Sequence, residues 1–352
     1  MTPRTPFGSA LASVATLGLL SLTLLGGNEA FAQSGPTAQP PYKISVFARS
    51  ANGYTQPDSI VQWQDTILVG FQNGVAKDGT DGKSSTIVQY SLRGDVLRTF
   101  SVPGHNDGLR IVGRSALWSV QNEDANPNLV VIDLETGRQT QYSFPPTPHG
   151  GGYDDMVVVD DQVYITASNP NVNSAGVNVF PALVRARLAG SMVMLDTILL
   201  GNATATDIST GTAVTLNLTD PDSLTVDPRG NIVLDDQQDA VLVFIRNPGT
   251  DHQKVGMINI TSSAGPTTLD DTAFAPSPPS YILVSDVMGN AVYRIDDPSF
   301  GFEPDTAYTG SDTIGIVAKL DLDSGVLAPI VTGLGSARGM IFVPMTDSDS
   351  SD

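Results

Sequence analysis

The 352-residue chain contains no cysteine. Its folding therefore does not depend on disulfides, and a soft, thiolate-based metal site is excluded. Hydrophobic residues make up 40% of the chain, which at this length is enough for a core that needs no cross-links. We expect a hydrophobic core to carry the stability of the fold.

Positive charge is scarce. Eighteen Lys and Arg residues stand against 37 Asp and Glu, which gives a formal net charge of −19. Nucleic acid is excluded as a partner, because phosphate binding requires clustered Lys and Arg. Surplus carboxylates instead favour solubility outside the cell and the binding of cations.

Several catalytic motifs are also missing. The chain has no Gly-x-Ser-x-Gly elbow, no His-Glu-x-x-His zinc motif, no P-loop and no dinucleotide fingerprint. These absences argue against a serine hydrolase, a zincin and an enzyme driven by nucleotides.

Long hydrophobic runs are absent except at the start. Arg4 precedes the apolar stretch 10–25, and Ala30-Phe31-Ala32 follows it, which is typical of a signal peptide. We predict a signal peptide over 1–32 with cleavage near Ala32, an exported mature protein and no membrane span in it; an uncleaved anchor is the alternative. Residues 33–41 predict a Pro-rich linker, and residues 346–352 predict a disordered acidic tail.

Helical periodicity is absent, and an internal repeat takes its place. Each copy is an acid, a short apolar strand, a polar turn and a second apolar strand. Three copies align without a gap, at 58–70, 107–119 and 154–166, looser copies begin at Asp222 and Asp271, and a truncated one spans 338–343. Strand units that recur every 50 to 70 residues, roughly, indicate a single all-β domain, a β-propeller over 42–345.

The strand count favours six blades, with five as the alternative. Six inner strands are followed by only five pairs of middle strands, and one outer strand, 43–49, is left over at the amino end. We therefore expect strands 43–49 and 338–343 to complete one blade together. Gly94, Gly137 and Gly325 end the expected outer hairpin turns. The polar stretches 72–85, 168–181 and 297–313 are expected to be surface loops.

Propeller geometry gives the repeated acid a place. The residues that open the inner strands converge on one mouth of the channel, and here they are Asp58, Asp107, Asp154 or its neighbour Asp155, Asp222, Asp271 and Arg338. So many like charges repel one another and require compensation. A divalent cation, Arg338, protonation or backbone amides can supply it, and oxygen ligands favour Ca²⁺ or Mg²⁺. An Asp that opens a strand can also be purely structural, as the acceptor of an Asx-turn.

Two of the three histidines precede these acids in the sequence. His105 comes two residues before Asp107, and His149 lies five residues before Asp154. Both are candidates for a general base or a ligand, with a solvent-facing loop histidine as the alternative. His252 belongs to a turn at the opposite rim. Arg338 is a candidate for binding a substrate oxyanion or for pairing with the acids.

The repeats resemble propellers of the SMP-30/gluconolactonase and NHL types. The resemblance lies in 57–61, 221–235 and 337–344, where Pro-Asp-Ser-strand and Asp-Pro-Arg-Gly-Asn-strand units occur. It is a resemblance of scaffold and implies a divalent metal, with Ca²⁺ the first choice, and lactonase activity at the channel mouth. The chain departs from the first family because no Glu opens an inner strand.

Two functions follow as hypotheses. One is a metal-dependent hydrolase of lactones or esters, in which His105 or His149 removes a proton. The other, typical of the NHL type, is a propeller of the cell envelope that binds a small molecule or a partner without chemistry. The sequence makes no prediction of oligomeric state.

Overall fold

The computed structural model describes residues 35–263, 267–277, 279–299 and 301–345. Its regular secondary structure is strand, from β1 (Thr37–Ala38) to β27 (Ala337–Pro344). In the described residues no helix is long and apolar enough to cross a membrane. The predicted signal peptide, 1–32, and the predicted tail, 346–352, lie outside the described residues.

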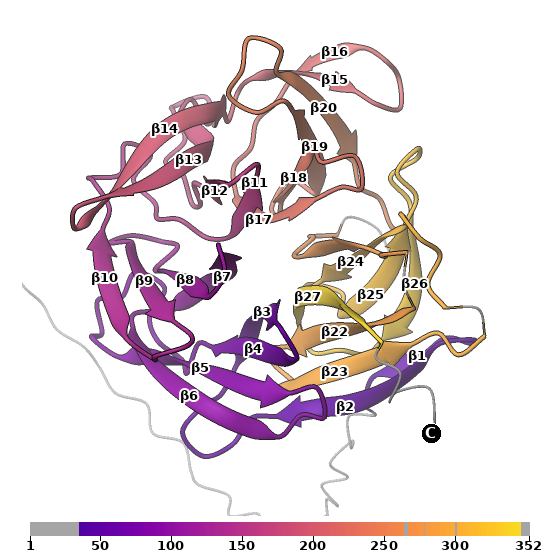
Figure 1. Cartoon of the computed structure of the whole chain (residues 1–352). Helices are drawn as coiled ribbons and strands as arrows, with labels where there is room; N and C mark the ends of the chain where they lie inside the picture. Colours follow the sequence, from indigo (N-terminus) through magenta and orange to yellow (C-terminus); the bar gives the residue numbers. More distant parts are fainter. Residues whose placement is uncertain (1–34, 264–266, 278, 300, 346–352) are drawn as a thin grey trace, which may run out of the picture. The chain divides into compact units, whose positions relative to one another are not determined.

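The strands are arranged around a central channel as a β-propeller (Figure 1). The first two repeats form two antiparallel runs of four strands, each in chain order. These are β3 (Pro57–Trp63), β4 (Thr66–Phe71), β5 (Ser84–Ser91) and β6 (Val96–Pro103), followed by β7 (Asn106–Val112), β8 (Ala116–Gln121), β9 (Asn128–Asp133) and β10 (Gln139–Ser143). The all-β propeller predicted from the repeats is confirmed.

The third and fourth repeats are built in the same way. Their runs are β11 (Met156–Val159), β12 (Gln162–Thr166), β13 (Pro181–Ala189) and β14 (Met192–Leu200), then β17 (Pro221–Val226), β18 (Ile232–Asp236), β19 (Val241–Arg246) and β20 (Lys254–Asn259). A parallel bridge between Ser143 and Met192 joins β10 to β14. A small hairpin of β15 (Thr204–Asp207) and β16 (Ala213–Thr215) extends the outer edge of β20.

The last two runs exchange their order in the chain. After β21 (Thr272–Phe274), the chain forms β22 (Ser280–Asp286) and β23 (Ala291–Asp296), which pair with β27 rather than with β21. The run begun by β21 is completed later by β24 (Ala307–Ser311), β25 (Ile316–Leu320) and β26 (Leu327–Thr332). The expectation of a surface loop over 297–313 was therefore wrong at its end, since β24 is buried along its whole length.

The two ends of the described chain complete one sheet. Its order is β2 (Lys43–Arg49), β23, β22 and β27. The predicted strands 43–49 and 338–343, which are β2 and most of β27, therefore lie in the same sheet, as expected. Within the predicted linker 33–41, β1 pairs with β26. In the described residues the pairings thus comprise six antiparallel runs of four strands. We propose that each run is one blade; the number of blades stays a prediction.

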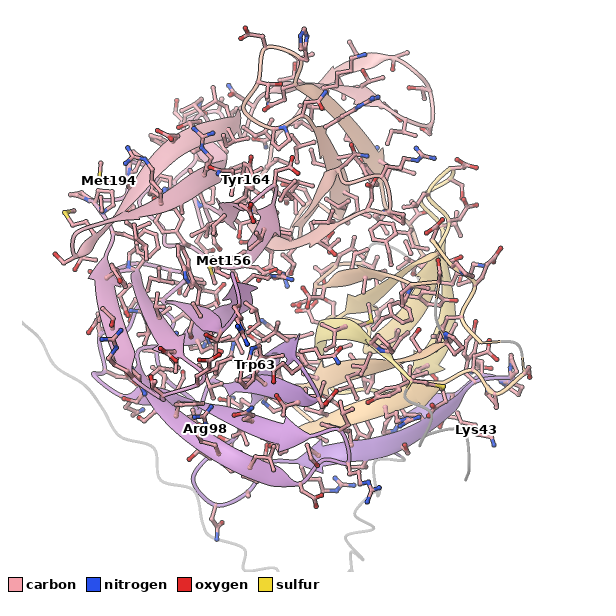
Figure 2. All side chains as sticks on the ribbon, viewed as in Figure 1. Lys43, Trp63, Arg98, Met156, Tyr164 and Met194 are labelled. Carbon is pink, nitrogen blue, oxygen red and sulfur yellow. The ribbon has the colours of Figure 1, made fainter. Side chains whose placement is uncertain are left out.

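The core lies between neighbouring runs, where alternate side chains of each sheet interdigitate (Figure 2). One buried cluster, for example, joins Ile67 and Val88 of the first run to Tyr281 and Val343 of the sheet that closes the ring. Such packing fixes the inner strands against one another. Because the inner strands are packed in this way, the residues that open each of them are held in fixed positions.

Candidate functional site

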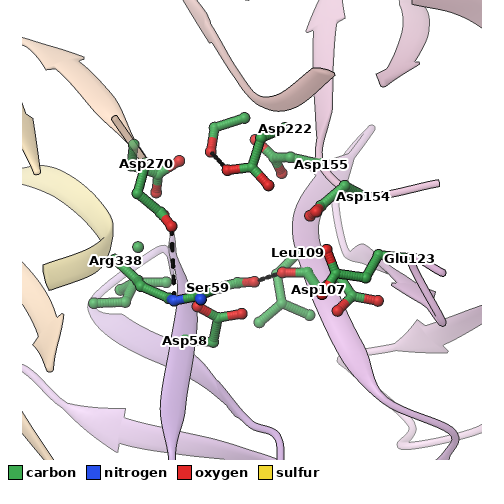
Figure 3. A pocket seen from close by; sticks show the side chains of 14 residues that line it. Asp58, Ser59, Asp107, Leu109, Glu123, Asp154, Asp155, Asp222, Asp270 and Arg338 are labelled. Atoms are coloured by element: carbon green, nitrogen blue, oxygen red, sulfur yellow. Dashed lines mark hydrogen bonds and ion pairs between the residues drawn. The ribbon is translucent and has the colours of Figure 1, made fainter. Parts of the chain in front are cut away.

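The entry residues of the inner strands follow a two-residue pattern. The first residue of each pair faces the channel, and these residues are Asp58, Asp107, Asp154, Asp222, Asp270 and Arg338 (Figure 3). The residues that follow them are Ser59, Gly108, Asp155, Ser223, Asp271 and Gly339. In the fifth copy the channel-facing residue is Asp270, one position before the Asp271 chosen from the sequence.

The second residue of each pair connects one inner strand to the next. Asp155 Oδ2 accepts a hydrogen bond from the backbone N–H of Leu224 at 3.0 Å. Asp271 Oδ2 accepts one from Met340 N–H at 2.7 Å. A side chain on Gly339 would meet the backbone oxygen of Asp58 at 2.2 Å, so only glycine fits there. Asp271 therefore has an architectural contact of its own, although it also lines the cavity.

The channel-facing acids surround a cavity of about 30 Å³. This is room for roughly two water molecules or one small cation. Asp58, Asp107, Asp222 and Asp270 are 5–7% exposed and Asp154 is 9% exposed. A substrate larger than water must therefore lie above this cavity, at the mouth of the channel.

Glu123 also lines the cavity and is 5% exposed. It does not open an inner strand; it follows β8, in the connection to β9. One carboxylate oxygen each from Glu123, Asp154 and Asp222 lies within 4.8 Å of the others. We call these three residues the carboxylate triad. His105, Asp107 and Glu123 form a second group that satisfies the same distance limit.

Two cations offset part of this charge, and they lie beside different acids. Lys77, from the loop between β4 and β5, forms an ion pair with Glu123. Arg338 Nε lies 3.7 Å from Asp270 Oδ2, and its Nη2 lies 3.9 Å from Asp312 Oδ2. With Glu123, six channel carboxylates face these two cations, an excess of four negative charges when all are ionised.

Burial dominates the electrostatics of the acids. It raises the pKa of Asp154 well above its ordinary value, and the neighbouring Asp222 raises it further. The pKa of Asp222 is also raised by burial and then by Asp220. Burial alone would raise the pKa of Glu123 as well, but Lys77 lowers it below the ordinary value. The protonated form is therefore favoured for Asp154 and Asp222, and the ionised form for Glu123.

The donor set fits a hard divalent cation. Asp107 Oδ2 is buried and has no hydrogen-bond partner among the described residues, and Asp154 and Asp222 carry charge that no basic side chain pairs with. Three carboxylates at this separation, with no soft ligand, match the preference of Ca²⁺ or Mg²⁺ for oxygen. The residues present therefore fit the cation that the sequence resemblance implies.

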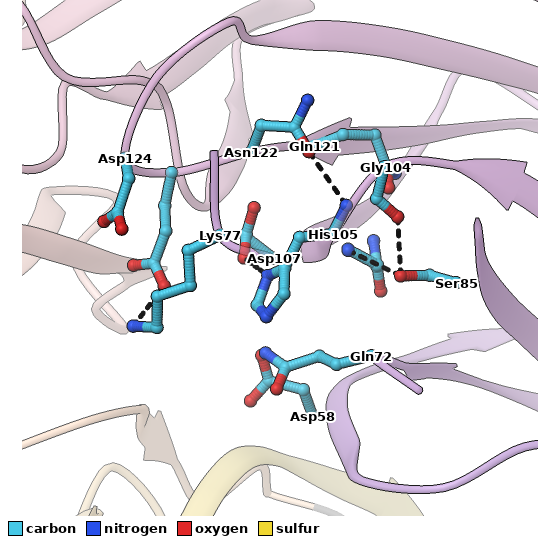
Figure 4. A network of polar contacts seen from close by, with 12 residues as sticks. Asp58, Gln72, Lys77, Ser85, Gly104, His105, Asp107, Gln121, Asn122 and Asp124 are labelled. Atoms are coloured by element: carbon cyan, nitrogen blue, oxygen red, sulfur yellow. Dashed lines mark hydrogen bonds and ion pairs between the residues drawn. The ribbon is translucent and has the colours of Figure 1, made fainter. Parts of the chain in front are cut away.

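His105 is oriented by the acid beside it (Figure 4). Its Nδ1 lies 2.6 Å from Asp107 Oδ1, and its backbone N–H donates to Asn122 Oδ1. Burial lowers the pKa of His105, so the imidazole is neutral at neutral pH. In the tautomer whose Nδ1–H donates to Asp107 Oδ1, the Nε2 atom keeps a free lone pair. This is the arrangement of a histidine general base.

His149 has a different environment. Its Nε2 lies 2.7 Å from the backbone oxygen of Gly152, and its ring packs edge-on against Tyr153. The side chain is buried, and neither histidine lines the channel cavity itself, but His105 is grouped with Asp107 and Glu123 within 4.8 Å, whereas His149 belongs to neither group of acids. An Nε2–H that donates to a carbonyl leaves Nδ1 as the basic atom, and Nδ1 has no partner among the described residues. The structure thus gives His105 and His149 different surroundings, although the sequence presents them as equivalent candidates.

Three residues of the site were missed by sequence reasoning. Asp270 could have been found, because Asp270-Asp271 repeats Asp154-Asp155. Glu123 and Lys77 have no counterpart in the aligned copies, since both come from connections between the second and third strands of their runs. No repeat signal identifies such residues. Asp58, Asp107, Asp154, Asp222 and Arg338 do come together at the cavity.

The comparisons with known proteins found similar structures but no matching sequence family or curated sequence. Among solved structures, virginiamycin B lyase from Staphylococcus aureus is 9% identical, covers 87% of this chain and 89% of its own, and has a TM-score of 0.48. The periplasmic gluconolactonase of Pseudomonas aeruginosa is 10% identical, with coverage of 82% and 89% and a TM-score of 0.45.

One of these neighbours carries the gluconolactonase name, which is also one of the two propeller types that the repeats resemble. At such identities and TM-scores the activities in their names are not transferred to this chain.

Proposed function

We propose that this protein is an exported propeller that binds a divalent cation at the carboxylate triad and hydrolyses a lactone or related ester at the channel mouth. The observation that carries the proposal is the triad itself, Glu123, Asp154 and Asp222, buried and within 4.8 Å of one another beside a neutral His105. Export rests on the signal peptide predicted over 1–32.

The triad would hold the cation, with Ca²⁺ the first choice because all three ligands are carboxylates. When bound, a divalent cation polarises an ester carbonyl and lowers the pKa of water. Asp154 and Asp222, whose pKa values are raised, would release protons on loading, since a proton and a cation compete for the same oxygens. Cation binding should therefore strengthen as the pH rises.

His105 would act as the general base. Its Nε2 accepts a proton from water, while Asp107 holds the ring through Nδ1. The hydroxide equivalent adds to the acyl carbon, the bond from that carbon to the ester oxygen breaks, and the proton passes to the departing oxygen. One water is consumed, and a hydroxy acid, or an acid and an alcohol, is formed. Arg338 Nε, which has no hydrogen-bond partner among the described residues, would donate to an oxyanion.

Substrate recognition would fall to the loops above the cavity. The cavity admits little more than a cation, so the acyl group would lie outside it, and the connections 72–83 and 167–180 are candidates for contacting it. These connections are predominantly polar, which suits a hydroxylated substrate such as a sugar lactone.

Metal content and activity test the proposal together. After dialysis against a chelator, the protein is titrated with Ca²⁺, Mg²⁺, Mn²⁺ and Zn²⁺ in a calorimeter, and δ- and γ-lactones are assayed with the preferred ion. Asp154→Asn and Asp222→Asn should each weaken cation binding at least about tenfold. Asp65→Asn, in the exposed turn between β3 and β4, is the matched control and should bind as the wild type does.

Each result has a distinct meaning. Absence of binding for all four ions would refute the cation site and with it the hydrolase. Cation binding without turnover of any lactone or ester would instead favour a propeller that binds a ligand without chemistry. Equal loss in the Asp65 variant would show that net charge, and not the triad, governs binding.

A further inference from the structure

A cationic groove lies on the fourth run of strands, away from the acidic mouth. It is lined by Arg229, Asn231, Phe244, Arg246 and Lys254, and we call this set the cationic groove. Arg229 and Asn231 belong to the turn between β17 and β18, Phe244 and Arg246 to β19, and Lys254 to β20. No acidic residue lines it, although the chain has twice as many acids as bases.

Two of these cations repel each other across the sheet. Arg246 and Lys254 are directly opposite in the antiparallel pairing of β19 and β20. Side chains at such positions are neighbours on one face, and like charges placed there are destabilising. Among the described residues neither side chain forms an ion pair, and Arg229 beside them forms none either. The fold therefore tolerates a repulsion that nothing inside it relieves.

The third cation is presented by a rigid turn. Asp227 Oδ1 accepts hydrogen bonds from the backbone N–H groups of Arg229 and Asn231, at 2.9 and 2.8 Å. Asp227 Oδ2 accepts a third hydrogen bond, from Asn231 Nδ2. Asp227 thereby holds the turn, and it forms no ion pair with the cations of the groove among the described residues.

The floor of the groove is apolar and partly open. Phe244 is half-buried and lies opposite Gly256 in the pairing of β19 with β20. Gly256 has no side chain of its own, and the side chain of Ile208 lies next to it. The groove measures about 440 Å³, which is within the range of small-molecule sites, about 300–1,000 Å³.

A second hollow continues the groove. It measures about 380 Å³ and shares Arg229, Asn231 and Phe244 with the first. Its lining also holds a second aromatic residue, Phe274, and three acids, Asp227, Asp305 and Asp323. The whole depression therefore combines cations, aromatic rings and carboxylates, and it is longer than a single small anion requires.

We propose that the cationic groove binds a short chain of acidic sugars, with a uronate carboxylate on Arg246 and Lys254. The apolar face of a sugar ring packs on Phe244, while Asp305 and Asp323 accept hydrogen bonds from hydroxyl groups of the next unit. A bound carboxylate relieves the repulsion between Arg246 and Lys254. This site is independent of the cation triad and of the hydrolysis proposed there.

Calorimetry with defined probes tests the groove. The wild-type protein is titrated with tri-galacturonate in a chelator, so that no divalent cation contributes, and with a neutral galactose trisaccharide and inorganic phosphate in parallel. We expect binding of the acidic trisaccharide and at least about tenfold weaker binding of the other two, because only the first offers both charge and ring faces. The double variant Arg246→Gln/Lys254→Gln should lose at least about tenfold in affinity.

The control removes the same charge elsewhere. Arg138→Gln/Arg187→Gln also deletes two exposed cations that form no ion pair among the described residues, and it should bind as the wild type does. Equal loss in the control, or phosphate binding as strong as that of the acidic sugar, would overturn the proposal, as would a failure of the wild type to bind. Melting temperatures distinguish loss of the groove from loss of the fold. Lys254→Gln alone should melt no lower than the wild type, because it removes a repulsion.

Discussion

The Oδ2 atom of Asp271 accepts the backbone N–H of Met340 at 2.7 Å and thereby links the fifth inner strand to the sixth. Asp155 and Leu224 form the equivalent contact between the third and fourth inner strands. The two pairs have the same sequence separation, 69 residues. Repeated acids in this chain therefore have two roles, one in the channel and one between strands.

Asp271→Ala is expected to destabilise the protein by about 1–3 kcal/mol, because the buried N–H of Met340 loses its acceptor. Cation affinity should change little. Chemical denaturation measures the first and calorimetric titration the second, with Asp65→Ala as the exposed control. Loss of cation binding at an unchanged melting temperature would instead make Asp271 a ligand, as the sequence predicts.

Lys77→Met is expected to raise the affinity for a divalent cation about tenfold, equivalent to about 1.4 kcal/mol. The ammonium group of Lys77 occupies Glu123, so a cation must share this carboxylate with it or displace it. Titration of the chelator-treated protein measures the change. Lys83→Met is the matched control, because Lys83 lies on the same loop and pairs with Asp81 instead. Equal gains in cation affinity in the two variants would show that Lys77 acts only through the net charge of the protein.

His105→Ala is expected to lower kcat/KM for a lactone about 100-fold or more, the usual contribution of a general base. Wild-type activity should increase with pH through a value below 6.5, since burial lowers the pKa of His105 and only neutral imidazole accepts a proton. His149→Ala should leave this pH profile in place, because His149 belongs to neither group of acids, whereas His105 lies within 4.8 Å of ligand atoms of Asp107 and Glu123. A larger loss in the His149 variant would reverse the assignment.

Stability should depend on pH through Asp271. Burial raises its pKa from 3.8 to about 7, so the folded protein holds a proton that the unfolded chain has lost over this interval. The contribution of this proton to the free energy of unfolding is fully present below pH 3.8 and is lost as the pH rises through about 7. The melting temperature of the wild type relative to Asp271→Asn should therefore fall by a few degrees, roughly, between pH 4 and pH 8.

This comparison removes opposing contributions. The pKa values of His105 and His149 are lowered by burial, and their effect on stability has the opposite sign below 6.5. Both histidines are present in the wild type and in Asp271→Asn, so they cancel in the difference. A difference that stays constant with pH would show that Asp271 is ionised in the folded protein throughout. Scanning calorimetry in a chelator is the appropriate measurement.

The sequence by itself determined the propeller and most of the channel-facing acids. A repeat of two short strands opened by an acid places Asp58, Asp107, Asp154 and Asp222 at equivalent points, and equivalent points in a propeller meet at one mouth. It also anticipated that β2 and β27, near the two ends of the chain, share a sheet. These features follow from the repeat, and a repeat can be recognised from the amino-acid sequence alone.

Only the tertiary structure decided what was not periodic. Strand β24 was missed because Ala307-Tyr-Thr-Gly-Ser311 has little apolar character, and the exchange of β22 and β23 between runs depends on long-range pairing. Glu123 and Lys77 reach the cavity from unaligned loops, and a one-residue step puts Asp270, not Asp271, opposite Arg338. The burial of the channel acids and their pairing with Lys77 and Arg338 depend on contacts between residues that are distant in sequence. No local sequence pattern encodes such contacts.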